Sequence, residues 1–202
     1  MSELFSIQLQ NRQQQGGDGV WLDLPTTTEQ VQAALRQIGI SSDNPQGLFI
    51  SGYFAEEEKR FAIPYNMVLA SNVDELNFLA AQLETLSAGE RAELNAALQA
   101  PQSELSSIGR ITDFPENVDY YVHLPDVHGP AQLGDYYLNR SGMVDMPEEW
   151  KGGIDTAQFG RYVAQQEQGV FTEYGYLVKS GDAWQKVHEG QPVPEEYRVL
   201  SF

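Results

Sequence analysis

The stretch VWLDLPTTTEQVQAALRQIG, residues 20–39, indicates the type of fold near the start of the chain. VWLDL is typical of a strand, and Val31 and Leu35 then lie on one face of the next segment at helical spacing. Thr26 and Glu29 have the spacing of a capping box at the start of that helix. A strand followed directly by an amphipathic helix predicts a mixed α+β fold.

The neighbouring stretches extend this pattern. Residues 4–10 alternate between apolar and polar side chains, and a Gly-rich turn at 13–19 would join them to 20–25 as a β-hairpin. LFISGYFA, residues 48–55, is typical of a third strand. These stretches predict a small β-β-α-β unit that ends near residue 64.

The middle of the chain is predicted to be helical. Ser71 with Asp74, and Ser87 with Glu90, have capping-box spacing at the start of two helices that would form an αα-hairpin. A third, shorter helix is expected in SELSSIG, residues 103–109.

The last third alternates between strand and helix patterns. We expect a strand at 118–124, helices at 131–140 and 154–168 (the second capped by Asp155), a hairpin of 170–180 with 183–190, and an extended tail. The predicted fold class is therefore α+β, an elongated chain of three small domains. Their bounds are 1–66 for an N-terminal α+β domain, 67–112 for a helical middle domain and 113–202 for an acidic C-terminal α+β domain.

Net charge is the unusual property of these 202 residues. The 29 acidic residues against 12 basic ones give a net charge of −17, which would repel DNA, RNA and anionic lipid. There is no Cys, no apolar run long enough to span a membrane, and no basic and apolar leader in MSELFSIQLQNRQQQ. We expect a cytoplasmic protein that contacts neither nucleic acid nor membrane directly.

No motif predicts catalysis or a cofactor. His123, Asp126 and His128 could supply metal ligands, but their spacing fits no compact zinc pattern, and incidental histidines in a solvated turn are preferred. Neither a nucleophile elbow nor a phosphate-binding glycine loop is present. We therefore expect no enzyme activity, no metal and no cofactor.

The acidic residues concentrate in the C-terminal third. The net charges of the three predicted domains, in chain order, are −4, −4 and −9. Between residues 113 and 149 one basic residue, Arg140, accompanies eight carboxylates. They are spread through several predicted elements, which favours a folded acidic surface over a disordered acidic tail, although each could also be an ordinary solvated acid. The eight are Asp113, Glu116, Asp119, Asp126, Asp135, Asp145, Glu148 and Glu149.

Four stretches resemble the ArdA family of antirestriction proteins. They are LDLPTTTEQVQAALRQIGI (22–40), DELNFLAAQLETL (74–86), IDTAQFGRYVAQQEQGVFTEYGYL (154–177) and VPEEYRVLSF (193–202). The resemblance implies a three-part protein, typically encoded on mobile genetic elements, that dimerises and imitates DNA. It further implies that the eight carboxylates contact the DNA-binding groove of a Type I restriction-modification enzyme.

The charge fits this implied role independently. Duplex DNA carries about one charge per 1.7 Å of axis, so a net charge of −17 corresponds to roughly 29 Å of duplex and all 29 carboxylates to about 49 Å. Because one chain is short for a long DNA footprint, a homodimer is expected. Two alternatives stay open: an acidic adaptor for another basic nucleic-acid-binding protein, and a carboxylate-dependent glycan hydrolase.

Overall fold

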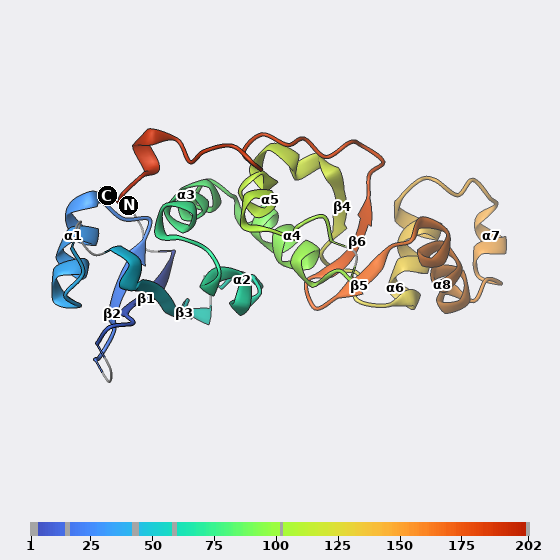
Figure 1. Cartoon of the computed structure of the whole chain (residues 1–202). Coiled ribbons are helices and arrows are strands. Elements are labelled where there is room, and N and C mark those ends of the chain that lie inside the picture. The colour runs from blue at the N-terminus through green and yellow to red at the C-terminus, as the bar shows by residue number, and fades with distance from the viewer. Residues whose placement is uncertain (1–3, 15–16, 42–44, 58–59, 102, 201–202) are drawn as a thin grey trace. The chain divides into compact units, whose positions relative to one another are not determined.

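The computed structural model describes residues 4–14, 17–41, 45–57, 60–101 and 103–200. It has a mixed α+β fold in which the described strands form two three-stranded antiparallel sheets, so the predicted fold class is confirmed at this level. Internal contacts divide the chain into two compact units (Figure 1). Unit 1 comprises residues 1–87, 104–116 and 185–202, and unit 2 comprises 88–103 and 117–184. The division into three domains stays a prediction.

Unit 1 is built on the predicted hairpin and the helix that follows it. Its elements are β1 (Phe5–Asn11), β2 (Val20–Leu24), α1 (Thr28–Gln37), β3 (Leu48–Phe54), α2 (Tyr65–Leu69), α3 (Val73–Glu84) and α5 (Ile108–Thr112). The strand order is β2-β1-β3, with Ile7 opposite Leu22 and a bulge in β3 beside Gln8 and Leu9. Alternate β1 side chains enter the core, where α1 and α3 contact β2. The predicted turn at 13–19 lies partly outside the described residues.

The capping box of α1 lies one residue later than predicted. Thr27, with extended backbone angles, accepts a hydrogen bond from the Gln30 amide, and the Gln30 side chain caps the Thr27 amide. Thr26 is buried, and its own amide donates to Asn77 Oδ1 on α3 at 2.7 Å. The tertiary contact of Thr26 with α3 therefore fixes where α1 begins, and the predicted cap of Thr26 with Glu29 is wrong.

The same shift occurs at α3. Asn72 and Glu75 form its capping box, in place of the predicted Ser71 and Asp74. Ser71 Oγ donates to the Met67 carbonyl at 2.8 Å, so this side chain completes the end of α2. The Asp74 side chain instead accepts hydrogen bonds from the backbone amides of Val199 and Leu200.

Unit 2 combines a second small sheet with a pair of packed helices. Its elements are α4 (Ala88–Gln99), β4 (Tyr121–Leu124), α6 (Pro130–Asp135), α7 (Glu148–Lys151), α8 (Thr156–Glu167), β5 (Val170–Thr172) and β6 (Gly175–Lys179). Its sheet order is β4-β6-β5, and α4 packs against β4 and β6. The cap of α8 at Asp155 is confirmed, since its carboxylate accepts from the Gln158 amide at 3.0 Å. The predicted hairpin of 170–180 with 183–190 is wrong, because β5 and β4 occupy both edges of β6.

Helices α6 and α8 lie side by side (Figure 1) and cross at two glycines. A Cβ built at Gly160 would lie 1.8 Å from the Pro130 carbonyl oxygen, and one at Gly134 would lie 1.9 Å from the Thr156 carbonyl oxygen. Each distance is far below van der Waals contact, so only glycine permits this approach. The core beside the crossing contains Leu133 and Tyr176, which are fully buried.

No helix among the described residues is both long and apolar enough to cross a membrane.

Candidate functional site

The eight predicted surface carboxylates divide between the two units. Asp113 and Glu116 belong to unit 1, and the other six belong to unit 2. Their side chains fall into three groups: one is buried, two are paired with a cation, and five are exposed without an ion pair among the described residues. The five are Glu116, Asp119, Asp126, Asp145 and Glu149.

Asp113 is the buried one, and its prediction as a surface residue is corrected. Its side chain has 0% exposure, and its two carboxylate oxygens accept hydrogen bonds from the backbone amides of His188 and Glu189. Because this carboxylate satisfies two backbone donors inside unit 1, it is not available to a partner. A sequence separation of 75 residues hides this role from local patterns.

The segment that Asp113 holds consists of residues 185–200, which we call the C-terminal strap. Asp74 on α3 accepts from the amides of Val199 and Leu200 at 2.8 and 2.9 Å, and Asn77 donates to the Tyr197 carbonyl at 3.0 Å. Val199 is buried. The prediction of an extended tail therefore missed an integral part of unit 1, because the partners of the strap lie 75 to 126 residues away in the sequence.

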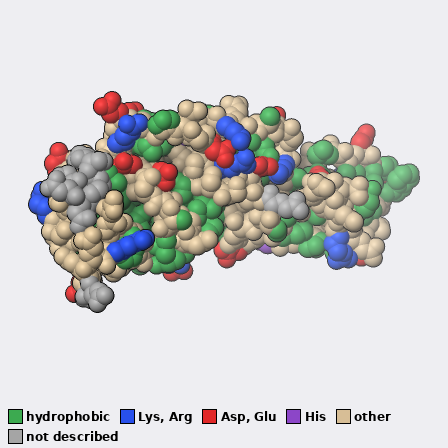
Figure 2. All heavy atoms as spheres, in the orientation of Figure 1, with side chains coloured by type: hydrophobic (Ala, Val, Ile, Leu, Met, Phe, Trp, Pro, Cys, Tyr) green, Lys and Arg blue, Asp and Glu red, His purple; other side chains and the backbone are tan. Residues whose placement is uncertain are grey.

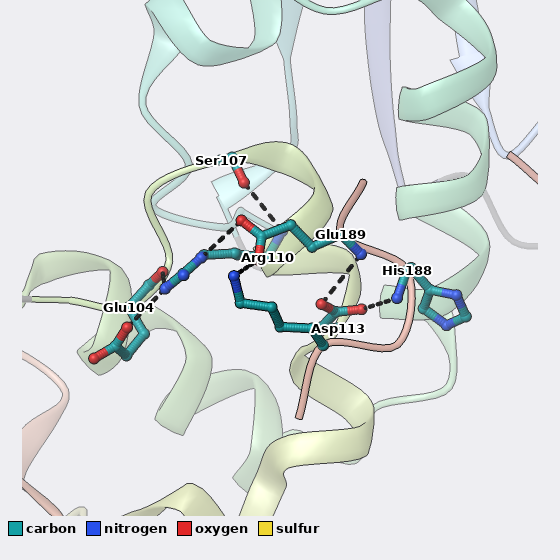
Figure 3. A network of polar contacts seen from close by, with 7 residues as sticks. Glu104, Ser107, Arg110, Asp113, His188 and Glu189 are labelled. Carbon is teal, nitrogen blue, oxygen red and sulfur yellow. Dashed lines mark hydrogen bonds and ion pairs between the residues drawn. The ribbon is translucent and has the colours of Figure 1, made fainter. Parts of the chain in front are cut away.

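An ion-pair network accompanies the strap (Figure 3). Arg110 on α5 donates from Nε to Glu189 at 2.9 Å and from Nη1 to Glu104 at 2.6 Å. Lys186 also pairs with Glu189, at 3.1 Å. The hydrogen bond from Arg110, and then that from Lys186, lowers the pKa of the Glu189 carboxyl. Arg110 and Lys186 thus both pair with Glu189, which belongs to the strap.

Two of the predicted carboxylates in unit 2 are neutralised locally. Asp135 pairs with Arg140 at 2.8 Å, and Glu148 pairs with Lys151 at 2.9 Å. Each pair has one well-exposed member, Arg140 at 67% and Glu148 at 81%, so each pair adds little to stability. They do reduce the charge that Asp135 and Glu148 can offer to a partner.

A second group of acids, in which Glu93 interacts with Glu90 and Asp119, was missed by sequence reasoning. Glu93 on α4 has its Oε1 buried without a hydrogen-bond partner among the described residues. Burial first, and then repulsion from Glu90 and Asp119, raises the pKa of Glu93 to about 8. Glu90 and Glu93 have the i, i+3 spacing of one helix face, which could have indicated the pair. Asp119 comes from another segment, so only the fold brings it close.

The raised pKa of Glu93 predicts a pH-dependent stability. An unfolded chain releases this proton near 4.5 and the folded chain near 8, so the folded state binds more protons between these values and stability falls as pH rises through that window. Replacing Glu93 with Gln should remove the decline and raise the free energy of unfolding at pH 8 by about 1 kcal/mol, allowing for solvent screening. Urea unfolding at pH 5 and pH 8 measures this. Parallel pH profiles for the two proteins would contradict it.

The candidate metal ligands do not come together. His123 Nε2 lies 2.7 Å from the Tyr174 carbonyl oxygen, as expected for a donated hydrogen bond, and His128 is exposed. Within the part of the chain that the structure describes, no three His or carboxylate side chains gather at a spacing that could hold a metal ion.

A cavity of about 950 Å³ in unit 1 lies between the strap and the first residues of α3 and α5. Three carboxylates line it, and each already has a structural partner: Asp74 binds strap amides, Glu75 caps α3, and Glu189 pairs with Arg110. These acids hold the strap and the helix in place. This arrangement gives no support to a carboxylate-dependent hydrolase.

Figure 2 shows one face of the molecule by side-chain type. Asp and Glu side chains occur there in small groups, with Lys and Arg among several of them. On this face the acids do not form one continuous band. On this face the anionic side chains are therefore distributed over separate groups.

The fold and the distributed carboxylates define an acidic α+β protein whose exposed charges suit a basic partner. The family model of the antirestriction protein ArdA matches residues 16–178, which is most of the chain. The chain therefore belongs to the ArdA family of antirestriction proteins, which is not a known enzyme family. Membership implies an antirestriction function. A search of curated proteins finds no match.

Proposed function

We propose that this ArdA-family protein is a DNA mimic that competes with duplex DNA for the DNA-binding groove of a Type I restriction-modification enzyme in the cytoplasm. The observation that carries the proposal is a net charge of −17 on a folded chain, with five carboxylates between residues 116 and 149 exposed and without an ion pair among the described residues.

The mechanism is electrostatic competition. A groove that binds duplex DNA gains affinity by releasing counterions from phosphates, and it can gain affinity in the same way from fixed carboxylates. Asp126 and Glu149 lie on a turn and on a short helix of a folded unit, so they bind at a smaller cost in conformational entropy than a flexible acidic tail would. Imitation of the backbone without base edges predicts inhibition of enzymes with different target sequences.

A homodimer is part of the proposal, because the charge of one chain corresponds to roughly 29 Å of duplex. Two aromatic residues of the last third are already used inside unit 2, since Tyr176 is buried and Trp184 packs on Tyr120, so neither offers a free surface to a second copy. Sedimentation equilibrium measures the mass in solution. A monomer at the concentrations that inhibit the enzyme would contradict this part.

The proposed function predicts a steep salt dependence. We expect the concentration of protein that half-inhibits cleavage by a Type I enzyme to rise at least tenfold between about 50 and 200 mM salt, because charge neutralisation dominates binding. Cleavage assays at constant enzyme and DNA concentration, with the DNA Km measured at each salt concentration, test this. Equal potency at both concentrations would exclude the electrostatic mechanism. Capture of basic proteins other than restriction subunits would favour the adaptor alternative.

The predicted surface can be tested by charge removal. Replacing Asp119, Asp126 and Asp135 together with Asn should lower inhibitory potency about tenfold, since two exposed anionic contacts are lost and the loss of Asp135 leaves the charge of Arg140 uncompensated, at an otherwise unchanged fold. A matched control removes the same charge from exposed acids elsewhere: Asp18→Asn, Glu195→Gln and Glu196→Gln. Equal losses in both triple variants would show that total charge matters and that the chosen surface does not.

A further inference from the structure

The sheet of unit 1 has an open edge at β2. Its strand order is β2-β1-β3, so among the described residues the edge of β2 that faces away from β1 pairs with no other strand. The opposite edge is covered, because α2 contacts β3 and the Tyr65 hydroxyl donates to the Ser51 carbonyl at 3.3 Å. An open edge presents backbone N–H and C=O groups that a further strand can pair with. β2 is therefore the edge at which this sheet can be extended.

A groove of about 230 Å³ runs along the open edge, between β2 and α1. Helix α1 lies beside β2 at this end of the sheet (Figure 1). The consecutive residues 20–23 all line the groove. Because neighbouring strand residues point their side chains to opposite faces, such a lining means that the strand edge itself forms one wall. On the opposite wall α1 contributes Ala33 and Ala34, which are small enough to leave room for a side chain.

Trp21 and Asp23 lie on the outer face of β2, and Leu22 between them is buried. The Trp21 indole lies over Gly52, where an added Cβ would be 3.0 Å from Cη2, and the side chain is nevertheless 50% exposed. Asp23 accepts from the Ser6 hydroxyl at 2.8 Å and has no ion pair among the described residues. An accessible indole and a carboxylate two residues apart suit Lys or Arg side chains on a neighbouring strand.

We infer that β2 and α1 form a binding groove for an extended basic segment of a partner protein, which adds to the sheet of unit 1 as a fourth strand. Backbone hydrogen bonds to β2 supply affinity, and alternate side chains supply specificity. Apolar side chains such as Val enter the groove over Ala33, and the Lys or Arg side chains between them lie beside Trp21 and Asp23. The inference goes beyond the proposed function, because this site takes a peptide strand and does not imitate DNA.

Charge selects this occupant. Asp23 is the one charged residue among the described residues that line the groove, and the net charge of the chain is −17. A second copy paired through the same edge would bring two identical acidic edges together and would supply neither Asp23 with a cation. A strand that carries Lys or Arg gives this carboxylate a partner.

The test uses a fluorescent peptide, acetyl-Lys-Val-Lys-Val-Lys-Val-Lys-amide, titrated with the intact chain and followed by fluorescence anisotropy. We expect saturable binding, with slower hydrogen exchange of β2 amides and unchanged exchange of β3 amides in the complex. Two further peptides carry backbone N-methyl groups on every Val or on every Lys. They keep the charge but lose one set of N–H donors, so one of the two should bind at least about tenfold more weakly.

Equal binding of all three peptides would reduce the interaction to charge attraction and overturn the inference. Absence of binding by the unmethylated peptide at about 1 mM would overturn it as well. A fall in the molecular mass of the wild type on peptide addition, measured by sedimentation, would show that a second copy occupies the edge and would also overturn it.

Variants of the groove test its two walls. Ala33→Leu fills the space beside β2 and should weaken binding at least about tenfold, whereas Ala33→Ser leaves the space open and should bind like the wild type. Asp23→Asn should weaken binding about threefold at low salt and have little effect at high salt, where charge is screened. Glu196→Gln removes the same charge from an exposed residue of unit 1 outside the groove, so it is the matched control.

Unchanged affinity of Ala33→Leu would place the peptide elsewhere and overturn the inference. Thermal unfolding checks that this variant is folded, since Ala33 is only partly buried. If it does not fold, the methylated peptides decide the question on the wild type. None of these results depends on inhibition of a restriction enzyme, so the proposed function is tested separately.

Discussion

Replacing Gly160 with Ala is expected to destabilise unit 2 by about 3 kcal/mol. The added methyl group would lie 1.8 Å from the Pro130 carbonyl oxygen and 2.8 Å from the Gly134 nitrogen. Both atoms belong to the backbone of α6, so neither can rotate away as a side chain could. Helices α6 and α8 must then separate, which loosens the core around Leu133.

Urea unfolding followed by circular dichroism measures this loss. Gly89→Ala is the control, because a Cβ at Gly89 in α4 meets nothing within 4 Å. That change should leave stability unaltered or raise it by about 0.5–1 kcal/mol, as alanine is the better helix former. If Gly160→Ala unfolds at the same urea concentration as the wild type, the close crossing of α6 and α8 is incorrect.

Replacing Asp113 with Ala is expected to cost unit 1 about 3 kcal/mol. The substitution removes a buried acceptor and leaves the amides of His188 and Glu189 without their partner, and hydrogen bonds to a charged group contribute about 1.5–3 kcal/mol each. The strap should then detach first at this end. Val199, at its other end, stays bound through Asp74.

Hydrogen exchange resolves the effect by residue. The amides of His188 and Glu189 should exchange much faster in Asp113→Ala than in the wild type. The β1 amides that exchange slowly in the wild type should remain protected in the variant until unit 1 unfolds. Glu116→Ala is the control, since Glu116 lies three residues further on and is exposed. Its stability should stay within about 0.5 kcal/mol of the wild type. Unchanged exchange in Asp113→Ala would show that the carboxylate does not hold the strap.

Gly160 shows how the structure explains a residue of a family motif in physical terms. FGR at 159–161 lies within the third stretch that resembles the ArdA family, and the sequence pattern gives no physical reason for its glycine. The structure supplies one, because Gly160 is where α8 touches the backbone of α6. A sequence shows that a glycine is present in a helix, but it does not show which carbonyl lies opposite.

Local patterns determined the element types in most of the chain. Strand alternation in β1 and helical spacing in α1, α3 and α8 depend on neighbours within a few residues, so the sequence alone predicts them. Net charge and the absence of Cys are likewise properties of composition, and the net charge already favoured a basic protein partner over nucleic acid. The family resemblance was confirmed by a match over residues 16–178.

Only the tertiary structure decided which acids are available. Asp113 and Glu116 look alike in sequence, but one is buried under the strap and the other is exposed, because contacts across 75 residues are not encoded in local spacing. Glu93 meets Asp119 for the same reason. The sequence by itself determined the amount of charge and the kinds of elements, whereas burial and pairing, which set what each charge can do, depend on long-range packing.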